Sequence, residues 1–471
     1  MEKITSFYYK KPFSFIVIVI EMIIILPCYL MPSARRKTIN NLWDEDGITK
    51  DNHPKTYFRR RSWSSSPRAE HEARTMKAVI LAAGQGARMG PFTVSEPKGM
   101  IPVANKPILE HVVAALVENN VREIVIVVGY QRQRIMSYFE DGKKFGSTID
   151  YVTQAKRLGT AHALWEARDK LGDRFLVLNG SNVVDAQAVA DLVHQEKTPT
   201  VLITESEEPT KYGAVVERDG LLERIVEKPT EPISNLINTG MYSLDKTFFQ
   251  EGEALIRAGK YDIPSILQEI AASGRVNVVR TTGKWTDALY PWDLLRLNAS
   301  ALTEIGEGRA GRMERDIHLH GKVLVGEGTT IRSGTYISGP VVIGEGCEIG
   351  PQVVIKPSTS IGKNVRIGPF TMVENSILMD DANVGPGSVI TQSVIGTGSS
   401  LGPRFTSLSG RASVEIEGEW HSVETVGSLV GEDVKMSGGV VAEPGTMVGA
   451  ACQIGSLVRL RGNLPNGSKV V

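Results

Sequence analysis

A glycine-rich turn followed by cations is the first stretch of the sequence whose residue types suit a chemical role. The stretch "LAAGQGARMGPFTVSEPK" covers residues 81–98, and its glycines and cations are Gly84, Gly86, Gly90, Arg88 and Lys98. Backbone N–H groups of such a turn can hold phosphate oxygens, and two fixed cations can neutralise a triphosphate and the charge that spreads during phosphoryl transfer. The stretch predicts a phosphate-binding loop; the alternative is an ordinary strand-to-helix turn with surface charges.

A dinucleotide-binding fingerprint is the competing interpretation of these glycines. That fingerprint needs a third glycine for helix packing and a helix that continues directly from the turn. Here Met89 occupies the place of the third glycine, and Pro97 and Lys98 follow where the helix would run on. Both departures weaken the dinucleotide interpretation and favour a nucleoside triphosphate.

The elements that must position this loop alternate between strand and helix. "KAVILAAG" and "REIVIVVGY" are continuous apolar runs typical of buried strands, and "PILEHVVAALVENNV" between them has apolar residues at helical spacing. "RFLVLNG" adds another buried strand, and "KYGAVVERDGLLERIVEKP" predicts a hairpin that turns at Asp219 and Gly220. Residues 76–302 therefore predict one α/β domain with a mixed, mostly parallel sheet.

After a linker at residues 303–318, the chain becomes periodic over residues 319–471. Every sixth residue is aliphatic in the series Leu319, Val325, Ile331, Ile337, Ile343, Ile349, Ile355, Ile361, Ile367, Val373 and Met379. The period resumes from Val430 to Leu460, after an interruption at residues 405–429. One inward aliphatic residue on each flat face is typical of a parallel β-helix. The interruption predicts a projecting loop or hairpin that could reach a neighbouring subunit.

The motifs of the α/β region resemble those of the sugar-1-phosphate nucleotidylyltransferases. The family pattern LAAGxGxRM, then PK, then a helix that begins at KP, is followed in family order by "QAKRLGTAHAL", "LVLNG", "YGAVV", "EKP", "NTGMY" and "KWTDALYPWDLL". The resemblance covers residues 76 to about 298. It implies a Rossmann-like domain that joins a pyrimidine nucleoside triphosphate, UTP or dTTP, to a hexose-1-phosphate and releases pyrophosphate. Positioning, Mg²⁺ and cations would carry the catalysis, with no side-chain nucleophile.

The same resemblance assigns roles to individual positions. The implied nucleotide-binding residues are Leu81, Ala82, Ala83, Gly84, Gly86, Gln154, Gly159 and Thr160, of which the last three would read the pyrimidine edge. The implied sugar-binding residues are Gly213, Glu227 and Asn238. The implied catalytic residues are the phosphate-binding Arg88, Lys98 and Lys228 and the Mg²⁺-binding Asp287.

One position departs from the family pattern. The family usually has aspartate directly after "LVLNG", as the first of two carboxylates that hold Mg²⁺, whereas this chain has Ser181. Mg²⁺ prefers anionic oxygens, so a site made of Ser181 and Asp287 should bind it weakly unless substrate phosphates or Asp185 compensate. Two function classes stay open: a nucleotidyltransferase, and a non-catalytic relative that binds nucleotide sugars or regulates a partner.

The two regions together resemble the bifunctional nucleotidylyltransferase/acetyltransferases with a C-terminal hexapeptide-repeat domain. That resemblance implies a left-handed β-helix with three repeats in each coil, and a homo-oligomer, a trimer. Acetyl transfer in that family uses a histidine, but the corresponding segment "NSILMDDANVGPGSVITQSVIG" contains none, and Pro386 lies near the expected place. The histidines after residue 302 are His318, His320 and His421. A structural or oligomerising β-helix is the expectation, and acyl-CoA binding or transfer by another arrangement the alternative.

Composition argues against nucleic acid as a partner, and it sets residues 1–75 apart from the rest of the chain. Lys plus Arg and Asp plus Glu each number 53, which gives no charge excess for nucleic acid, and the cysteines Cys28, Cys347 and Cys452 are too dispersed for a disulfide framework. A cytoplasmic protein is the expectation. Residues 1–75 contain the apolar run "FSFIVIVIEMIIILPCYLM" and a basic, serine-rich stretch. They predict an extension outside the working core; the alternative is a membrane anchor or signal sequence.

Overall fold

The fold is taken from a computed structural model, which describes residues 76–471. The expectations for residues 1–75, including the apolar run, fall outside the described residues. Within residues 76–471, no helix has both the length and the apolar character needed to cross a membrane.

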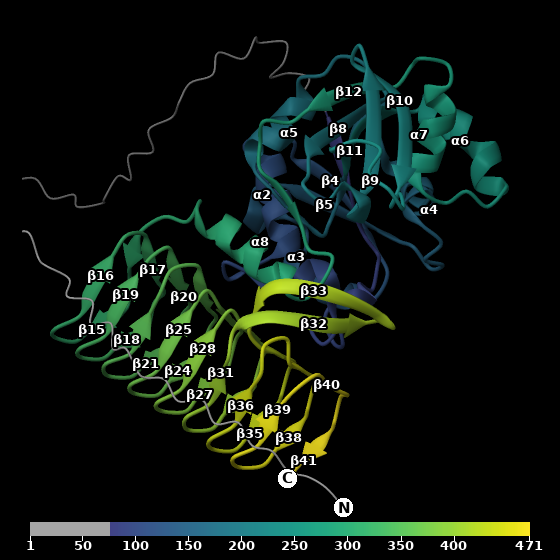
Figure 1. The fold of residues 1–471 in the computed structure, drawn as a ribbon. Coiled ribbons are helices and arrows are strands. Elements are labelled where there is room, and N and C mark those ends of the chain that lie inside the picture. The colour runs from purple at the N-terminus through teal and green to yellow at the C-terminus, as the bar shows by residue number, and fades with distance from the viewer. Residues whose placement is uncertain (1–75) are drawn as a thin grey trace, which may run out of the picture. The chain divides into compact units, whose positions relative to one another are not determined.

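A mixed sheet forms the centre of the α/β domain (Figure 1). Its order is β5 (Thr148–Thr153), β4 (Glu123–Val128), β1 (Lys77–Ala82), β6 (Arg174–Asn179), β11 (Leu236–Asp245), β8 (Thr200–Glu205), β12 (Asn277–Arg280), β10 (Leu221–Glu227) and β9 (Gly213–Arg218). Pairing is parallel from β5 to β6 and between β8 and β12, and antiparallel elsewhere. The predicted mixed, mostly parallel sheet is confirmed, because β10 and β11 run opposite to the direction that the other strands of the sheet share. The β9–β10 hairpin turns at Asp219 and Gly220, as predicted, with φ of 54° and 77°.

Helices cover both faces of this sheet, which is why its central strands β1, β4 and β6 are apolar without alternation. One face packs on α4 (Thr160–Ala167), α6 (Thr247–Arg257) and α7 (Ile263–Ala271), and the other on α2 (Ile108–Glu118), α3 (Arg132–Phe139) and α5 (Ala186–Val193). Side chains of β1 alternate between the two cores, with Val79 in the first and Ile80 in the second. The last helix of the domain is α8 (Asp293–Leu302).

Short elements gather where β1 and β6 end. The Gly180 N–H, just after β6, donates to the carbonyl of Leu81 on β1 at 3.0 Å. The 3-10 helices η1 (Ala87–Met89) and η2 (Lys98–Met100) follow β1, and β2 (Pro102–Val103) pairs with β3 (Lys106–Pro107). Beyond Gly180, β7 (Asn182–Val184) pairs antiparallel with β13 (Trp285–Asp287), so that Asn182 lies opposite Asp287. The carboxyl ends of the parallel strands thus meet segments from distant parts of the sequence.

Three parallel sheets form the β-helix (Figure 1). The first contains β14 (Gly308–Arg309), β17 (Val323–Val325), β20 (Val341–Ile343), β23 (Thr359–Ile361), β26 (Ile377–Leu378), β29 (Val394–Ile395), β34 (Leu429–Val430), β37 (Met447–Val448) and β40 (Asn463–Leu464). The second contains β15 (Arg312–Met313), β18 (Thr330–Ile331), β21 (Glu348–Ile349), β24 (Arg366–Ile367), β27 (Asn383–Val384), β30 (Ser400–Leu401), β35 (Lys435–Met436), β38 (Gln453–Ile454) and β41 (Lys469–Val470). The third contains β16 (His318–His320), β19 (Tyr336–Ser338), β22 (Val354–Ile355), β25 (Met372–Glu374), β28 (Val389–Thr391), β31 (Thr406–Ser407), β36 (Val441–Ala442) and β39 (Arg459–Leu460).

The hexapeptide period predicts the interior of this β-helix from Leu319 to Val373 and then slips by one residue. Ile343 pairs with Ile361, and Ile361 pairs with Leu378, so one coil is a residue shorter than the coil before it. Leu378 therefore lies in the interior where the strict period predicts Met379, and Met379 packs outside it. The segment 303–318, predicted as a linker, already holds β14 and β15, because short strands with few aliphatic residues do not show in the period.

The interruption of the β-helix is a hairpin of β32 (Gly410–Ile416) and β33 (Glu419–Val426) (Figure 1). Four apolar residues of this hairpin join a cluster that also contains residues of the α/β domain: Val414, Ile416, Val423 and Val426. The predicted hairpin is thus present, and it packs against its own chain.

Candidate functional site

A lysine and an aspartate meet at the carboxyl ends of β1 and β6. Lys98 Nζ lies 3.1 Å from Asp287 Oδ1, and the two side chains are only 17% and 13% exposed. The close packing of the Lys98 loop depends on Gly99, since a Cβ there would lie 2.7 Å from the carbonyl oxygen of Gly180. This contact fixes the Lys98 loop directly against the turn that contains Ser181.

Asp293 and Arg296, which are not among the predicted site residues, hydrogen-bond the backbone from Asp287 to Tyr290. A carboxylate oxygen of Asp293 accepts from the N–H groups of Leu289 and Tyr290 at 2.8 and 2.9 Å. Burial raises the pKa of Asp293. Arg296 donates to the Asp287 carbonyl at 3.2 Å. These bonds fix the position from which the Asp287 carboxylate is presented.

A cavity of about 330 Å³ adjoins Asp287. Besides Asp287, the predicted site residues that line it are Thr160, Gly213, Glu227, Lys228 and Asn238. Asn179, the last residue of β6, also lines it, so the cavity opens at the carboxyl end of that strand. Ligands of open α/β sheets gather at such ends.

Three of these residues pack directly on one another. A Cβ at Gly213 would lie 2.9 Å from Glu227 Oε2 and 3.6 Å from the Asn238 Cβ, so glycine allows the two polar side chains to approach. The Asn238 amide donates to the Tyr242 hydroxyl at 2.7 Å and accepts from the Gly240 N–H at 3.0 Å, which fixes its orientation. Burial raises the pKa of Glu227, and the neighbouring Lys228 opposes the shift. When ionised, the Glu227 carboxylate can accept hydrogen bonds from hydroxyl groups.

Aromatic and cationic residues complete the cavity wall. Lys228 has a φ of 44°, and its N–H donates to the Tyr212 carbonyl at 2.9 Å. Tyr212 packs edge to face on Trp285, with ring centroids 5.5 Å apart, and Lys211 lines the same cavity. Sequence reasoning did not assign roles to Lys211, Tyr212 or Trp285, although the last two lie inside the motifs "YGAVV" and "KWTDALY".

The glycine turn lies against Lys98. A Cβ at Gly86, which has a φ of 72°, would lie 2.8 Å from the Lys98 Cβ, while a Cβ at Gly84 would meet no atom within 4 Å. The turn begins where Leu81 and Ala82 end β1, with Ala83 next in the chain. The main chain of this turn thus lies beside Lys98, a predicted phosphate-binding cation.

The remaining predicted residues do not line this cavity. Arg88 is exposed, and its Nε donates to Glu417 at the tip of the β32–β33 hairpin at 3.1 Å. Gln154 is only 4% exposed, and its amide bonds the Gly159 carbonyl at 3.1 Å and the His162 Nδ1 at 3.0 Å. In this arrangement Gln154 supports the turn that leads to Thr160 and has its amide nitrogen engaged within the protein.

The residues around Asp287 fit Mg²⁺ only in part. Among residues 76–471, no group of three or more His, Cys, Asp or Glu side chains is arranged to hold a metal ion. Asp185 caps α5, where its carboxylate accepts from the Ala188 N–H at 3.0 Å. The Asn182 side-chain oxygen, opposite Asp287 in the β7–β13 pair, is buried and has no hydrogen-bond partner among the described residues. Asp287, Ser181 and Asn182 could thus supply oxygens, and substrate phosphates would have to supply the rest.

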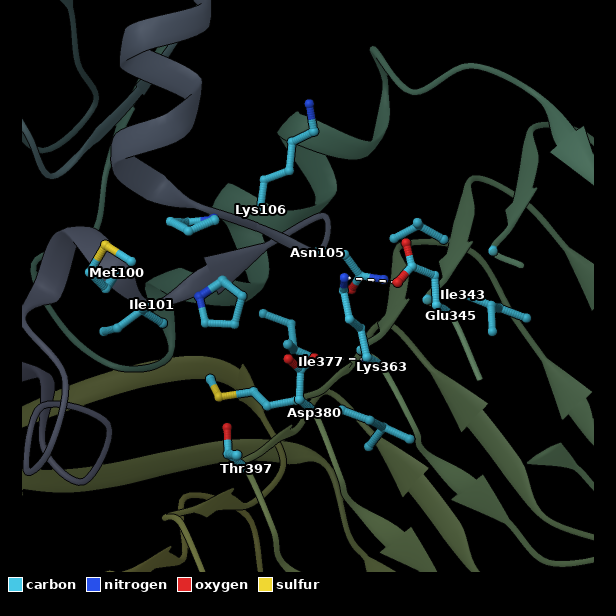
Figure 2. A pocket seen from close by; sticks show the side chains of 18 of the residues that line it. Met100, Ile101, Asn105, Lys106, Ile343, Glu345, Lys363, Ile377, Asp380 and Thr397 are labelled. Atoms are coloured by element: carbon cyan, nitrogen blue, oxygen red, sulfur yellow. Dashed lines mark hydrogen bonds and ion pairs between the residues drawn. The ribbon is translucent and has the colours of Figure 1, made fainter. Parts of the chain in front are cut away.

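A second cavity, of about 750 Å³, lies between the α/β domain and the β-helix (Figure 2). None of the predicted site residues lines it. Its lysines are paired, Lys363 with Glu345 at 2.9 Å and Lys106 with Glu110 at 3.2 Å. Because six predicted site residues line the smaller cavity beside Asp287 and none lines this one, we place the candidate site at the smaller cavity.

The chain is similar to known proteins in both of its domains. Residues 77–304 match the family described as Nucleotidyl transferase, and residues 337–443 match the GMPPB C-terminal domain. A Methanococcus maripaludis protein named Bifunctional protein GlmU is 34% identical over 392 residues, which cover 81% of this chain and 93% of that relative. A protein of Oryza sativa subsp. japonica named Probable mannose-1-phosphate guanylyltransferase 3 is 34% identical over 273 residues, which cover 56% of this chain and 74% of that relative.

A crystal structure of a putative glucose-1-phosphate thymidylyltransferase from Bacillus anthracis, in complex with a sucrose, is also similar. It is 30% identical, with a TM-score of 0.46, and the similarity covers 50% of this chain and 98% of that chain.

Proposed function

Because this chain belongs to the sugar-1-phosphate nucleotidylyltransferase family, we propose that it joins UTP or dTTP to a hexose-1-phosphate. The observation that carries the proposal is the Lys98–Asp287 pair beside the cavity that holds Glu227 and Asn238. This juxtaposition provides a cation for phosphates, a carboxylate for a metal ion and polar groups for a sugar in one place.

The reaction needs no covalent step on the protein. A phosphate oxygen of the hexose-1-phosphate forms a bond to the α-phosphorus of the triphosphate, and the bond from that phosphorus to the bridging oxygen breaks. The bridging oxygen keeps the electron pair and leaves as part of pyrophosphate. Lys98 and Arg88 neutralise the charge that spreads over the phosphates. Mg²⁺, bound by Asp287 with oxygens of Ser181 and Asn182 nearby, would add positive charge to the phosphates.

The cavity residues hold the second substrate in line for this attack. Glu227 and Asn238 lie where they can hydrogen-bond sugar hydroxyls, and Lys228 lies beside them as a cation for the sugar phosphate. The aromatic pair Tyr212 and Trp285 gives the sugar an apolar wall. Fixing both reactants in this way converts a bimolecular encounter into a step within one complex.

Pyrophosphate release is the direct test. The purified protein is incubated with Mg²⁺, each of UTP, dTTP and GTP, and a panel of hexose-1-phosphates. We expect pyrophosphate with UTP or dTTP and at least one sugar, and little with GTP. Turnover with GTP alone would contradict the pyrimidine assignment and leave the reaction class in place.

A non-catalytic binding protein is the second candidate. Ser181 favours this candidate, because of the two metal-binding carboxylates in the family pattern this chain keeps Asp287 alone. The Asp287 carboxylate is in addition paired with Lys98. Calorimetry with UDP- and dTDP-sugars separates the two candidates. Tight binding of a nucleotide sugar without pyrophosphate release, at saturating Mg²⁺, would support the binding protein.

A further inference from the structure

We propose that the β32–β33 hairpin of the β-helix is part of the nucleotide site, and that its Glu417 holds Arg88 until the triphosphate displaces it. The inference rests on the proposed function, because it takes Arg88 as a phosphate-binding residue. It assigns a role in triphosphate binding to a residue outside the α/β domain.

The geometry of the hairpin tip places Glu417 at this position. Glu417 and Gly418 form a two-residue turn with φ of 52° and 86°, values that suit the tight turn of a twisted hairpin. The Glu417 carboxylate accepts from Arg88 Nε at 3.1 Å, across 329 residues of sequence. An arginine of the phosphate loop is therefore neutralised by a carboxylate from the other domain.

Apolar contacts dock the hairpin beside that loop. Val414 and Ile416 on β32 belong to the same buried cluster as Met89 and Phe92, which flank the ion pair on the loop side. All four side chains are less than 10% exposed. Burial of this kind holds the hairpin in place without the ion pair, so loss of the Glu417 charge should leave the docking intact.

The hairpin also contacts the segment that follows Asp287. His421 on β33 packs on the ring of Tyr290, with centroids 4.3 Å apart, and lies 6.0 Å from the ring of Trp292. Tyr290 is three residues beyond Asp287. The hairpin therefore touches both segments that carry the predicted phosphate and metal residues, and it ties the nucleotide site to the β-helix.

The strength of the ion pair decides how it acts. The side chains of Arg88 and Glu417 are 45% and 52% exposed, and ion pairs at such positions contribute little free energy. A triphosphate carries several negative charges and can take Arg88 from a single carboxylate. Glu417 thus competes with the triphosphate for Arg88. This competition weakens triphosphate binding modestly and does not prevent it.

The test compares two charge removals on the same hairpin. Glu417→Gln removes the partner of Arg88, and Glu419→Gln is the matched control, because Glu419 is exposed and has no ion pair among the described residues. We expect Glu417→Gln to lower the KM for the triphosphate about two- to fivefold, with kcat and the KM for the sugar phosphate unchanged. Glu419→Gln should leave all three constants unchanged.

A double substitution checks that the effect passes through Arg88. Dissociation constants for the triphosphate are measured by calorimetry in Arg88→Ala and in Arg88→Ala combined with Glu417→Gln. Removing Glu417 should make no difference once Arg88 is absent. An equal KM in Glu417→Gln and the parent, or an effect that persists without Arg88, would overturn the inference.

The same measurements separate this inference from the proposed function. An inactive protein that binds the triphosphate still tests the role of Glu417 through the dissociation constants. If the protein is active but its KM and dissociation constant for the triphosphate are the same with and without Glu417, the inference is contradicted and the proposed function is not. A protein that binds no triphosphate contradicts both.

Discussion

Lys98 Nζ lies 3.1 Å from Asp287 Oδ1, although 189 residues separate the two in the sequence. The pair joins the predicted phosphate-binding loop to the predicted metal ligand, in a position that is largely shielded from water. A metal-bound triphosphate would exchange both partners at once, with phosphate taking Lys98 and the metal ion taking Asp287. The charges of the site are thus balanced before and after binding, which limits the cost of keeping them partly buried.

Lys98→Ala should lower kcat for pyrophosphate release by about 100-fold or more, because it removes a charge aimed at the transferring phosphoryl group. Lys143→Ala is the matched control, since Lys143 is an exposed lysine paired with Asp141. Initial rates of both variants are measured at saturating substrates, with thermal unfolding to check that each is folded. Equal rates in two folded variants would show that Lys98 does not contact the reacting phosphates.

The ionisation of Glu227 should make the KM for the hexose-1-phosphate depend on pH on the acid side of neutrality. Burial raises the pKa of this carboxyl, so it takes up its proton at a higher pH than an ordinary glutamate does. The ionised form accepts hydrogen bonds from sugar hydroxyls and the protonated form accepts them less well. The KM for the hexose-1-phosphate should therefore rise on acidification, beginning above the ordinary glutamate range, while the KM for the triphosphate responds less.

Glu227→Gln separates this ionisation from that of the substrate. The hexose-1-phosphate titrates identically with both proteins, so a difference between their pH profiles of KM belongs to Glu227. The variant should have a higher KM for the hexose-1-phosphate at neutral pH, and it should lack the rise in this KM on acidification that belongs to Glu227. Superimposable profiles would argue against a sugar contact by Glu227.

Local patterns in the sequence predicted the elements well, because they follow from burial. The six-residue period gives the interior of the β-helix, and apolar runs such as "REIVIVVGY" give strands covered on both faces. The same period misplaces Met379, because this coil is one residue shorter and Leu378 takes the interior position. The slip becomes visible in the sequence only further along, where the strict period reaches Gly385 and Thr391 while the aliphatic residues are Val384 and Ile390.

Contacts between distant segments were harder to predict. Motif order placed Glu227 and Asn238 together, but nothing in the sequence links Glu417 to Arg88, because an exposed ion pair leaves no local pattern. Gln154 illustrates the opposite difficulty: its motif suggests a contact with the base, whereas its amide nitrogen bonds Gly159 and His162. A residue type and its neighbours in sequence do not show which atoms are already engaged.

No acetyl transfer from acetyl-CoA to glucosamine-1-phosphate is expected. The segment of the β-helix around Pro386 offers no imidazole to take a proton from the amine, and His421 packs on Tyr290 beside the α/β domain. Thiol release from acetyl-CoA is followed with the parent and with His421→Ala. Turnover that survives in His421→Ala would show that another base acts in the β-helix.

Ser181→Asp should strengthen the binding of Mg²⁺. Ser181 follows Gly180, against whose carbonyl the Lys98 loop packs, and it precedes Asn182, which lies opposite Asp287. An added carboxylate about 4 Å from a divalent ion contributes several kcal/mol before desolvation, at an effective dielectric constant of about 20. After desolvation and competition from Lys98, we expect the half-saturating Mg²⁺ concentration for pyrophosphate release to fall about tenfold.

The neutral variant Ser181→Asn tests whether charge is the cause of that change. Both variants and the parent are titrated with Mg²⁺ at fixed triphosphate and sugar phosphate, and Mn²⁺ binding in the absence of sugar is measured by electron paramagnetic resonance as a readout that does not require turnover. In the parent, Asp185 Oδ1 accepts from the Ala188 N–H as the cap of α5, and Asp287, neutral oxygens and the substrate are the expected ligands of the ion. If Ser181→Asp binds the ion no more tightly than an active parent does, substrate phosphates and the buried Asn182 oxygen already complete the coordination. Position 181 would then tolerate serine without loss of catalysis.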